Sequence, residues 1–274
     1  MFPTLQGFSQ QLISVNGIKI NAVIGGEGPP ILLLHGWPET WWEWHHVMPP
    51  LAEHFSVVAM DLRGAGFSDC PLDGYDKATM ARDAHEVMRS FGHDRYAVCG
   101  HDIGGMVALP QAALFREAVS HLAVLDVPLP GWSGWEETIA KLWHFAFHAN
   151  RDLPERMIQG REYDYVSAFM AERFYDHSSF DPADIEIFAR AMALPGRTRG
   201  AWSGIERSQM ITRLHWNTRS NPSTYPSLLS EEISALACGW CPCCGSLRTT
   251  YPAAQSSGAV IMSLMSDPMR LPLR

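Results

Sequence analysis

Short apolar runs alternate along the chain with longer stretches of helical periodicity. Ile31–Leu34 is apolar at every position, which is typical of a strand buried on both faces of a sheet. Asn16-Gly17 separates two runs rich in β-branched residues and predicts the tight turn of a hairpin. This alternation predicts an α/β fold with a mostly parallel sheet and helices on both of its faces. We expect strands at Gln11–Val15, Ile18–Ile24, Ile31–Leu34, Ser56–Met60, Tyr96–Cys99 and Leu122–Leu125, and helices at Trp41–His54, Ala78–Phe91 and Met106–Glu117.

The pattern changes after residue 128. Pro128, Pro130 and Gly131 interrupt the alternation, and the chain from Trp132 to about Gly200 is helical and aromatic. We interpret residues 129–202 as a helical cap inserted over the sheet, and residues 1–128 as the N-terminal part of the core. A pair of ordinary core helices explains the aromatic residues equally well, because aromatic side chains at helical spacing usually pack inside.

Composition and charge narrow the class of protein. The 274 residues are 46% hydrophobic and 18% charged, with a formal net charge of −8, which suits one large domain with an inserted subdomain. The acidic balance argues against a nucleic-acid partner or an anionic membrane surface. No apolar run approaches the roughly 20 residues of a membrane span, and the N-terminus lacks the pattern of a signal peptide. We therefore expect a cytoplasmic protein.

Residues 100–105 read Gly-His-Asp-Ile-Gly-Gly, between a predicted strand and a predicted helix. This is the Gly-x-nucleophile-x-Gly spacing of a nucleophile elbow, in which small neighbours let strand and helix approach a strained backbone position. Asp102 occupies the nucleophile position. A carboxyl group with a reference pKa of about 3.9 is ionised at neutral pH and can form an ester with an electrophilic carbon. The alternative is a glycine-rich turn with a capping Asp.

Several polar residues follow predicted strands directly. His35-Gly36, Asp61, Asp102 and Asp126 each stand at the carboxyl end of such a run. In parallel sheets these ends meet at one edge, which is where ligands bind. The shared placement favours a functional role for Asp102 over a capping role.

Four motifs together resemble the α/β-hydrolase superfamily, and in particular its branch of epoxide hydrolases, haloalkane dehalogenases and haloacetate dehalogenases. The resemblance covers roughly residues 10–200. The motifs are His-Gly-Trp-Pro at 35–38, Asp-Leu-Arg-Gly-Ala-Gly-Phe-Ser-Asp at 61–69, the elbow at 100–105, and a cap stretch of Trp-His-Phe-Ala-Phe-His at 143–148 with Leu-Pro-Glu at 153–155 and Gly-Arg-Glu at 160–162.

The resemblance implies a set of catalytic roles. Asp102 is the implied nucleophile, and the backbone N–H groups of Trp37 and Ile103 are the implied oxyanion hole. The family also uses a His that activates water and an acid that orients this His. Asp126 matches one of the two positions for that acid, although an Asp that caps the turn before Pro128 is nearly as good an explanation. We expect a small-molecule substrate, and neither a cofactor nor a metal.

Departures from the family pattern narrow the substrate. Dehalogenases of this branch hold halide with a Trp after the nucleophile or carboxylate with an Arg near it, where this chain has Ile103 and Met106. Epoxide hydrolases use two cap Tyr hydroxyls. Trp143 stands at the first position, and an indole N–H donates a hydrogen bond without being a proton acid, which leaves Tyr163 or Tyr165 as substitutes. We favour an epoxide, with a dehalogenase or another hydrolase of the branch as the alternative. The expected substrate-binding residues are His35, Trp143, His144, Phe147 and Tyr163.

Residues 203–274 show neither clear strand nor clear helix periodicity. We therefore expect the last core strands to be missing, which leaves the strand at Leu122–Leu125 as an unpaired apolar edge. His215 is the only His of this region, and no predicted strand precedes it. A metal site at Cys238–Cys244 is disfavoured, because all four Cys lie within one heptapeptide instead of on separate turns.

A shifted reading frame accounts better for this region. When the codons are regrouped by one base, Ala259-Val260 permits Gly and Val260-Ile261 permits His, which is the order expected around a catalytic His of this family. Residues 203–274 are therefore interpreted as a degenerate or out-of-frame part of the core. A non-catalytic, truncated product that lacks the catalytic His is the alternative from another functional class.

Overall fold

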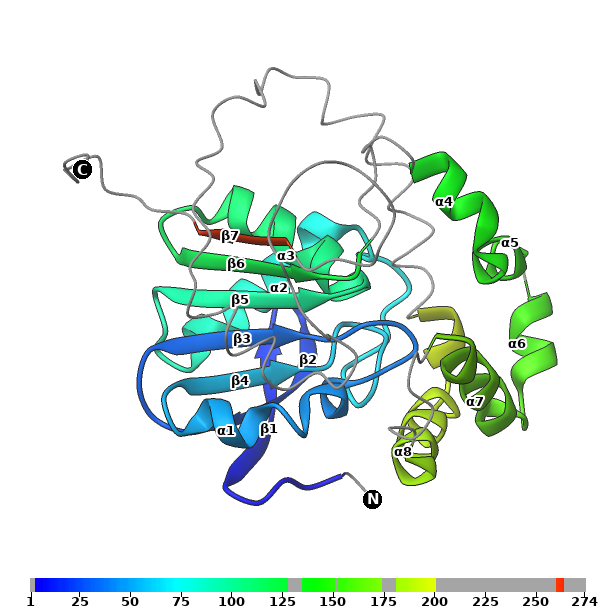
Figure 1. Cartoon of the computed structure of the whole chain (residues 1–274), viewed down its shortest axis with the longest axis horizontal. Coiled ribbons are helices and arrows are strands. Elements are labelled where there is room, and N and C mark those ends of the chain that lie inside the picture. The colour runs from blue at the N-terminus through cyan, green and yellow to red at the C-terminus, as the bar shows by residue number, and fades with distance from the viewer. Residues whose placement is uncertain (1–2, 128–134, 151, 174–180, 201–259, 264–274) are drawn as a thin grey trace, which may run out of the picture.

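The computed structural model describes residues 3–127, 135–150, 152–173, 181–200 and 260–263. Its centre is a seven-stranded sheet in the order β1-β2-β4-β3-β5-β6-β7 (Figure 1). The pairs among β4, β3, β5 and β6 are parallel, and the pairs of the outer strands are antiparallel. The predicted α/β fold is confirmed. The strands are β1 (Phe8–Val15), β2 (Ile18–Gly25), β3 (Pro30–Leu34), β4 (Ser56–Met60), β5 (Tyr96–His101), β6 (Val119–Leu125) and β7 (Val260–Ser263).

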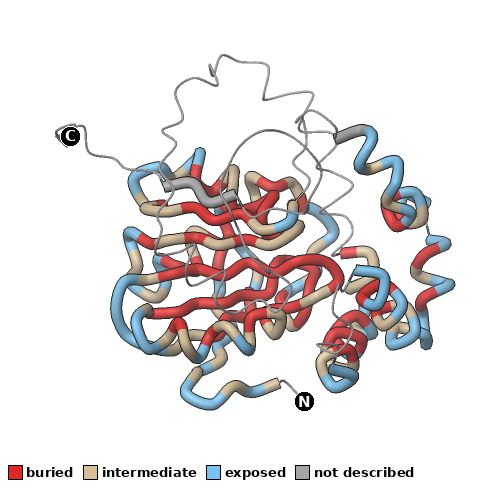
Figure 2. Tube along the Cα trace, viewed as in Figure 1, coloured by how far each residue is buried: buried red, intermediate tan, exposed pale blue. Residues whose placement is uncertain are grey.

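The two faces of the sheet pack against different helices, as the continuous apolar run of β3 predicts. Ile31 and Leu33 join the hydrophobic cluster that contains η1 (Trp41–Trp44) and α1 (Met48–Ala52). Leu32 and Leu34 point to the opposite face, where they join the cluster that contains α2 (Lys77–Ser90) and α3 (Ile103–Leu114). Figure 2 shows the strands as a buried layer between more exposed segments. Two hydrophobic clusters, one on each face, therefore fix the position of the sheet.

The helix predicted at 41–54 is wrong in its extent. The chain forms the four-residue 3₁₀ turn η1, opened by a hydrogen bond from Trp42 N to the Thr40 hydroxyl, and then the separate five-residue helix α1. Pro49 and Pro50 explain the interruption, because neither can donate the backbone hydrogen bond that a continuous helix requires at those positions. Both prolines are tolerated in the first turn of α1.

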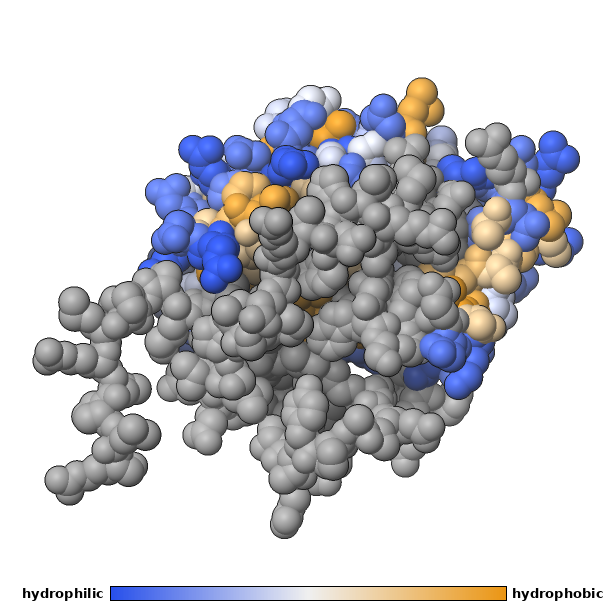
Figure 3. All heavy atoms as spheres, turned by 90° about the horizontal axis from the view of Figure 1, so that it is seen from above, coloured by the Kyte–Doolittle hydropathy of each residue, from blue (hydrophilic) through white to orange (hydrophobic). Residues whose placement is uncertain are grey.

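Among the described residues, five helices follow β6 and lie together beside the carboxyl end of the sheet (Figure 1). We call them the cap helices; the boundaries of the cap at 129–202 stay a prediction. No helix among the described residues is long and apolar enough to cross a membrane. Seen from above in Figure 3, hydrophobic side chains on the side of the cap helices form small groups among hydrophilic ones. The cap helices are α4 (Trp135–Lys141), α5 (Trp143–His148), α6 (Leu153–Ile158), α7 (Glu162–Arg173) and α8 (Pro182–Met192).

Strand β7 corrects the expectation that residues 203–274 contribute no strand. Val260 pairs with Val124 and Ser263 with His121, so β7 lies antiparallel on β6 and β6 is not an unpaired edge. The sequence reading missed it because a four-residue apolar run is too short to show a period. Residues 203–259 and 264–274, with His215 and Cys238–Cys244, lie outside the described residues, and the out-of-frame interpretation stays a prediction.

A buried carboxylate joins the elements around the carboxyl end of the sheet. Asp61 follows β4, is 0% exposed, and accepts a hydrogen bond from the side chain of Asn21 on β2 (2.8 Å). It also accepts hydrogen bonds from the backbone N–H groups of Trp41 (2.8 Å) and Phe67 (2.9 Å). Burial raises the pKa of Asp61, while these donors and the nearby His35 oppose that rise. Asp61 is thus a structural residue that fixes β2, η1 and the loop after β4 to one another.

Replacing one oxygen of the Asp61 carboxylate tests its contribution to the stability of the fold. Asp61→Asn removes the charge and puts an amide N–H₂ group against donors that it cannot satisfy. We expect it to lower the free energy of unfolding by about 2–3 kcal/mol, measured by urea denaturation. Asp73→Asn, an exposed position on the same loop, should change it by less than about 0.5 kcal/mol. Equal effects of the two substitutions would contradict the structural role.

Candidate active site

Asp102 lies in the turn between β5 and α3, with φ 47° and ψ −118°. Positive φ is unusual for a residue with a side chain and costs about 1–3 kcal/mol. The glycines around it are required by contact. A Cβ at Gly104 would overlap the carbonyl oxygen of Leu34, and one at Gly100 would overlap the backbone of Gly104. The strand–turn–helix predicted from the spacing is confirmed, and α3 begins at Ile103, directly after Asp102.

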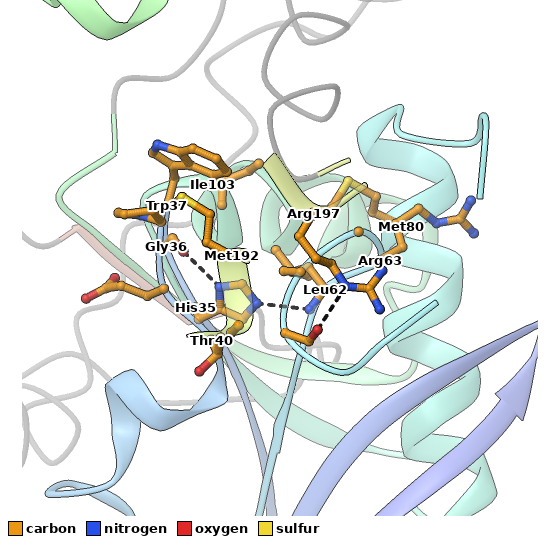
Figure 4. A pocket seen from close by; sticks show the side chains of 16 residues that line it. His35, Gly36, Trp37, Thr40, Leu62, Arg63, Met80, Ile103, Met192 and Arg197 are labelled. Carbon is orange, nitrogen blue, oxygen red and sulfur yellow. Dashed lines mark hydrogen bonds between the residues drawn. The ribbon is translucent and has the colours of Figure 1, made fainter. Parts of the chain in front are cut away.

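The turn after β3 faces the Asp102 carboxylate. The backbone N–H of Trp37 donates a hydrogen bond to Asp102 Oδ2 (2.9 Å). Trp37 and Ile103 line one pocket together with Met192 of α8 and Arg197 (Figure 4). The structure therefore brings together Asp102 and both residues that the sequence reading assigned to the oxyanion hole.

His35 is 2% exposed and lines the same pocket, but both of its ring nitrogens are used. Nδ1 lies 2.8 Å from the carbonyl oxygen of Gly36, and Nε2 accepts a hydrogen bond from the backbone N–H of Leu62 (3.0 Å). Burial lowers the pKa of His35 even though Asp61 opposes this shift, which keeps the ring neutral with its hydrogen on Nδ1. His35 thereby connects the turn after β3 to the loop after β4 (Figure 4).

Asp126 lies directly after β6, next to the strand that carries the nucleophile. The carbonyl oxygen of Leu125 accepts a hydrogen bond from the backbone N–H of Asp102 (3.1 Å). Asp126 is exposed and has a positive φ of 40°. Among the described residues its carboxylate has no hydrogen-bond partner, so its role in orienting a catalytic His stays a prediction.

The expected substrate-binding residues of the cap lie in three different environments. Trp143 is 43% exposed and its indole N–H donates to Glu172 (2.7 Å). Tyr163 is 39% exposed and lines a surface hollow between α7 and α8, away from Trp37. Phe147 is partly buried and stacks on Tyr165. The structure does not bring Trp143 or Tyr163 to the pocket beside Trp37.

Two other cap residues face the turn after β3 instead. The ring of His148 contacts the Trp37 indole edge-on, with 5.4 Å between the ring centroids. His148 Nε2 lies 2.7 Å from the hydroxyl oxygen of Tyr165. The sequence reading considered Tyr165 as a substitute donor but did not single out His148. Residues 163 and 165 point to opposite sides of α7, and α7 has too weak an apolar stripe to show which side faces inward.

His144 is buried, 6% exposed, between Phe169 and Arg173. The guanidinium of Arg173 donates a hydrogen bond to His144 Nδ1 (2.9 Å), which leaves the ring hydrogen on Nε2. Burial, with the charge of Arg173, lowers the pKa of His144 to about 3. At neutral pH this side chain is therefore a hydrogen-bond donor and not a proton acid.

A charged group next to the nucleophile was not recognised from the sequence. His101 Nδ1 lies 2.9 Å from Glu43 Oε1 and 3.6 Å from Glu39 Oε2, and Glu43 also accepts a hydrogen bond from the backbone N–H of Gly36. Burial alone would lower the pKa of His101, but the two carboxyl groups raise it well above its usual value. Burial and the charge of Glu43 raise the pKa of Glu39 to about 8.

Lys77, at the first position of α2, is a second cationic group that the sequence reading missed. It is 6% exposed, and its ammonium lies 3.9 Å from the sulfur of Met80. Burial lowers the pKa of Lys77 to about 7, while the charge of Asp102 opposes this shift. The charge of Lys77 therefore changes near neutral pH, within the electrostatic field of the nucleophile.

Comparison with known proteins agrees with this geometry. Residues 29–228 match the family model described as alpha/beta hydrolase fold, so the similarity continues past Trp202, where the sequence reading placed its end. The chain is 38% identical to the soluble epoxide hydrolase of Corynebacterium sp. (strain C12) over 193 residues, which cover 68% of this chain and 67% of that protein. It is 35% identical to the fluoroacetate dehalogenase of Burkholderia sp. over 208 residues, which cover 72% and 68%.

The fold is also similar to solved structures. The crystal structure of wild-type Cfl2 from Burkholderia cenocepacia superposes with a TM-score of 0.70 at 36% sequence identity. The match covers 77% of this chain and 74% of that chain.

The ion pair beside the nucleophile can be measured directly. In Glu43→Gln, His101 loses its nearest carboxylate, so we expect its pKa to fall by at least about one pH unit. Titration of the imidazole resonances by NMR measures this change. Because the wild-type pKa of His101 is raised, the stability difference between the two proteins should be complete below about pH 6.5 and disappear as pH rises through that pKa. Glu86→Gln, which removes an exposed partner of Arg89, is the control; an unchanged His101 titration in Glu43→Gln would rule out the pairing.

Proposed function

The chain belongs to the α/β hydrolase family and is a hydrolase similar to the family's epoxide hydrolases, and we propose that it hydrolyses an epoxide through an ester on Asp102. The hydrogen bond from Trp37 N to Asp102 Oδ2 is the observation that carries the proposal. It holds one carboxylate oxygen where negative charge develops when the ester is hydrolysed, and it leaves Oδ1 to attack.

The reaction follows in two steps. Asp102 Oδ1 attacks a ring carbon of the epoxide, the carbon–oxygen bond of the ring breaks, and the released oxygen takes a proton from a donor. Water then adds to the ester carbon of Asp102, and the resulting oxyanion on Oδ2 is stabilised by the N–H groups of Trp37 and Ile103. Collapse of this intermediate releases a diol and regenerates the carboxylate. In the family a His that is oriented by an acid activates this water; Asp126 is the proposed acid, and no His among the described residues is assigned the role of the base.

The proton donor for the ring oxygen belongs to the cap. His148, which contacts Trp37 beside the nucleophile, and Tyr165, whose hydroxyl lies 2.7 Å from His148 Nε2, are the candidates for this role. Trp143 and Tyr163 are the weakest of the substrate-binding candidates because both are exposed.

Haloacetate hydrolysis is the second candidate function. Arg197 lines the pocket with Trp37 and Ile103, and its guanidinium is a suitable partner for a carboxylate. Against it, Ile103 and Met106 are each 4% exposed and present apolar surface beside the nucleophile, where an unpaired anion is costly. Diol formation from an epoxide supports the first candidate, and fluoride release from fluoroacetate supports the second.

The nucleophile is tested by an almost isosteric substitution. Asp102→Asn should remove all hydrolysis, because a neutral amide does not attack carbon, while the melting temperature stays within a few degrees of wild type. Product formation by mass spectrometry is the measurement, and intact mass of the variant excludes deamidation back to Asp. Retained activity in verified Asp102→Asn shows that another group is the nucleophile.

The two steps should separate if the chain is the truncated product that lacks the catalytic His. A general base contributes about 10²–10⁴-fold, so ester hydrolysis should be slowed far more than attack. We expect a reactive epoxide to leave one covalent adduct on the peptide that contains Asp102, with almost no turnover, as seen by intact mass and peptide mapping. Sustained turnover would contradict the absence of a catalytic His, and no adduct on folded protein would contradict the epoxide proposal.

A further inference from the structure

Three metal-ligating side chains meet where the core contacts α8. His45 and His46 lie in the turn between η1 and α1, and Asp184 lies in the first turn of α8. One potential ligand atom from each of them falls within 4.8 Å of the others. The other such group among the described residues, formed by His101 with Glu39 and Glu43, already contains a close ion pair and adjoins the nucleophile.

The hydrogen bonds of His45 direct one lone pair toward Asp184. Nδ1 lies 2.7 Å from the carbonyl oxygen of Trp42, so the ring hydrogen is placed on Nδ1. Nε2 then presents its lone pair to Asp184 Oδ1 at 3.6 Å. Two acceptors that face each other in this way are stabilised by a cation between them.

A second layer of contacts fixes these ligands. The indole N–H of Trp42 donates to Asp184 Oδ1 (2.6 Å), and the same indole stacks on the His45 ring at 4.3 Å with an interplanar angle of 6°. Metal-binding His residues usually donate their second ring nitrogen to a carbonyl or carboxylate, which sets the tautomer and orientation. His45 has this arrangement through Trp42.

The spacing matches a tetrahedral ion of zinc size. Ligand bonds of about 2.0–2.1 Å in tetrahedral geometry place neighbouring ligand atoms about 3.4 Å apart, close to the 3.6 Å between His45 Nε2 and Asp184 Oδ1. His46 is exposed and adjoins His45, with 3.8 Å between the ring centroids, so an ion can enter from solvent. Two imidazoles and one carboxylate are ligands typical of Zn²⁺.

We propose that His45, His46 and Asp184 bind a divalent transition-metal ion, Zn²⁺ being the best match, with water as the fourth ligand. Two ligands come from the core and one from a cap helix, so the ion connects the two. The far end of α8 carries Ala191 and Met192, which line the pocket beside Trp37. The site does not depend on the identity of the substrate.

Zinc binding by the full chain tests the proposal through matched variants. Competition with a chromophoric zinc chelator gives the stoichiometry and affinity for wild type, His46→Gln, Asp184→Asn and His54→Gln. His54 is exposed and outside the cluster, so it is the control. Binding by Cys238–Cys244 is common to all four proteins and cancels in the comparison. We expect His46→Gln and Asp184→Asn to lose one equivalent, or at least about 10-fold in affinity, while His54→Gln matches wild type.

Thermal melting supplies an independent measurement. Zn²⁺ should raise the melting temperature of wild type and His54→Gln, because binding to the folded state alone stabilises it, and should raise those of His46→Gln and Asp184→Asn clearly less. Equal stoichiometry, affinity and melting shifts in all four proteins would overturn the site. If one variant fails to fold by circular dichroism, the other decides, since the two substitutions lie on opposite sides of the contact.

Discussion

One buried carboxylate determines how the carboxyl end of this sheet is built. Asp61 receives hydrogen bonds from a β2 side chain, from the first residue of η1 and from the loop after β4. An ion with no exposed surface persists only when its lone pairs are satisfied, so these three segments are constrained together. His35 adds a second connection between the turn after β3 and the loop after β4. The Trp37 N–H reaches the nucleophile because the turn that carries it cannot move independently.

The nucleophile is held in a conformation that its own backbone disfavours. Close contacts leave room only for glycine at positions 100 and 104, and they keep α3 against β3 and β5. Two charged groups lie close to Asp102. His101 pairs with Glu43, and the charge of Asp102 acts on Lys77. Conformational strain is therefore balanced by packing, and the reactive oxygen gains a defined direction.

The sequence predicted the parts of the structure that follow local rules. Apolar runs located the parallel strands, and the spacing around Asp102 located the elbow. The pairing of His101 with Glu43 joins residues 58 positions apart, for which no periodic signal exists. Tyr163 could not be distinguished from Tyr165, because α7 lacks a clear apolar stripe. The helix expected at 41–54 is interrupted, because Pro49 and Pro50 cannot donate the backbone hydrogen bonds that a continuous helix requires there.

Helix α8 connects the contact with Trp42 to the pocket beside Trp37. Asp184 near its start is held by Trp42, and Met192 at its end lines the pocket beside Trp37. They lie eight positions apart, about 12 Å along the helix axis. A tilt of about 5° around the Asp184 end moves the Met192 end by about 1 Å over that length. A shift at the contact between Asp184 and Trp42 would therefore move a side chain that lines the pocket beside Trp37.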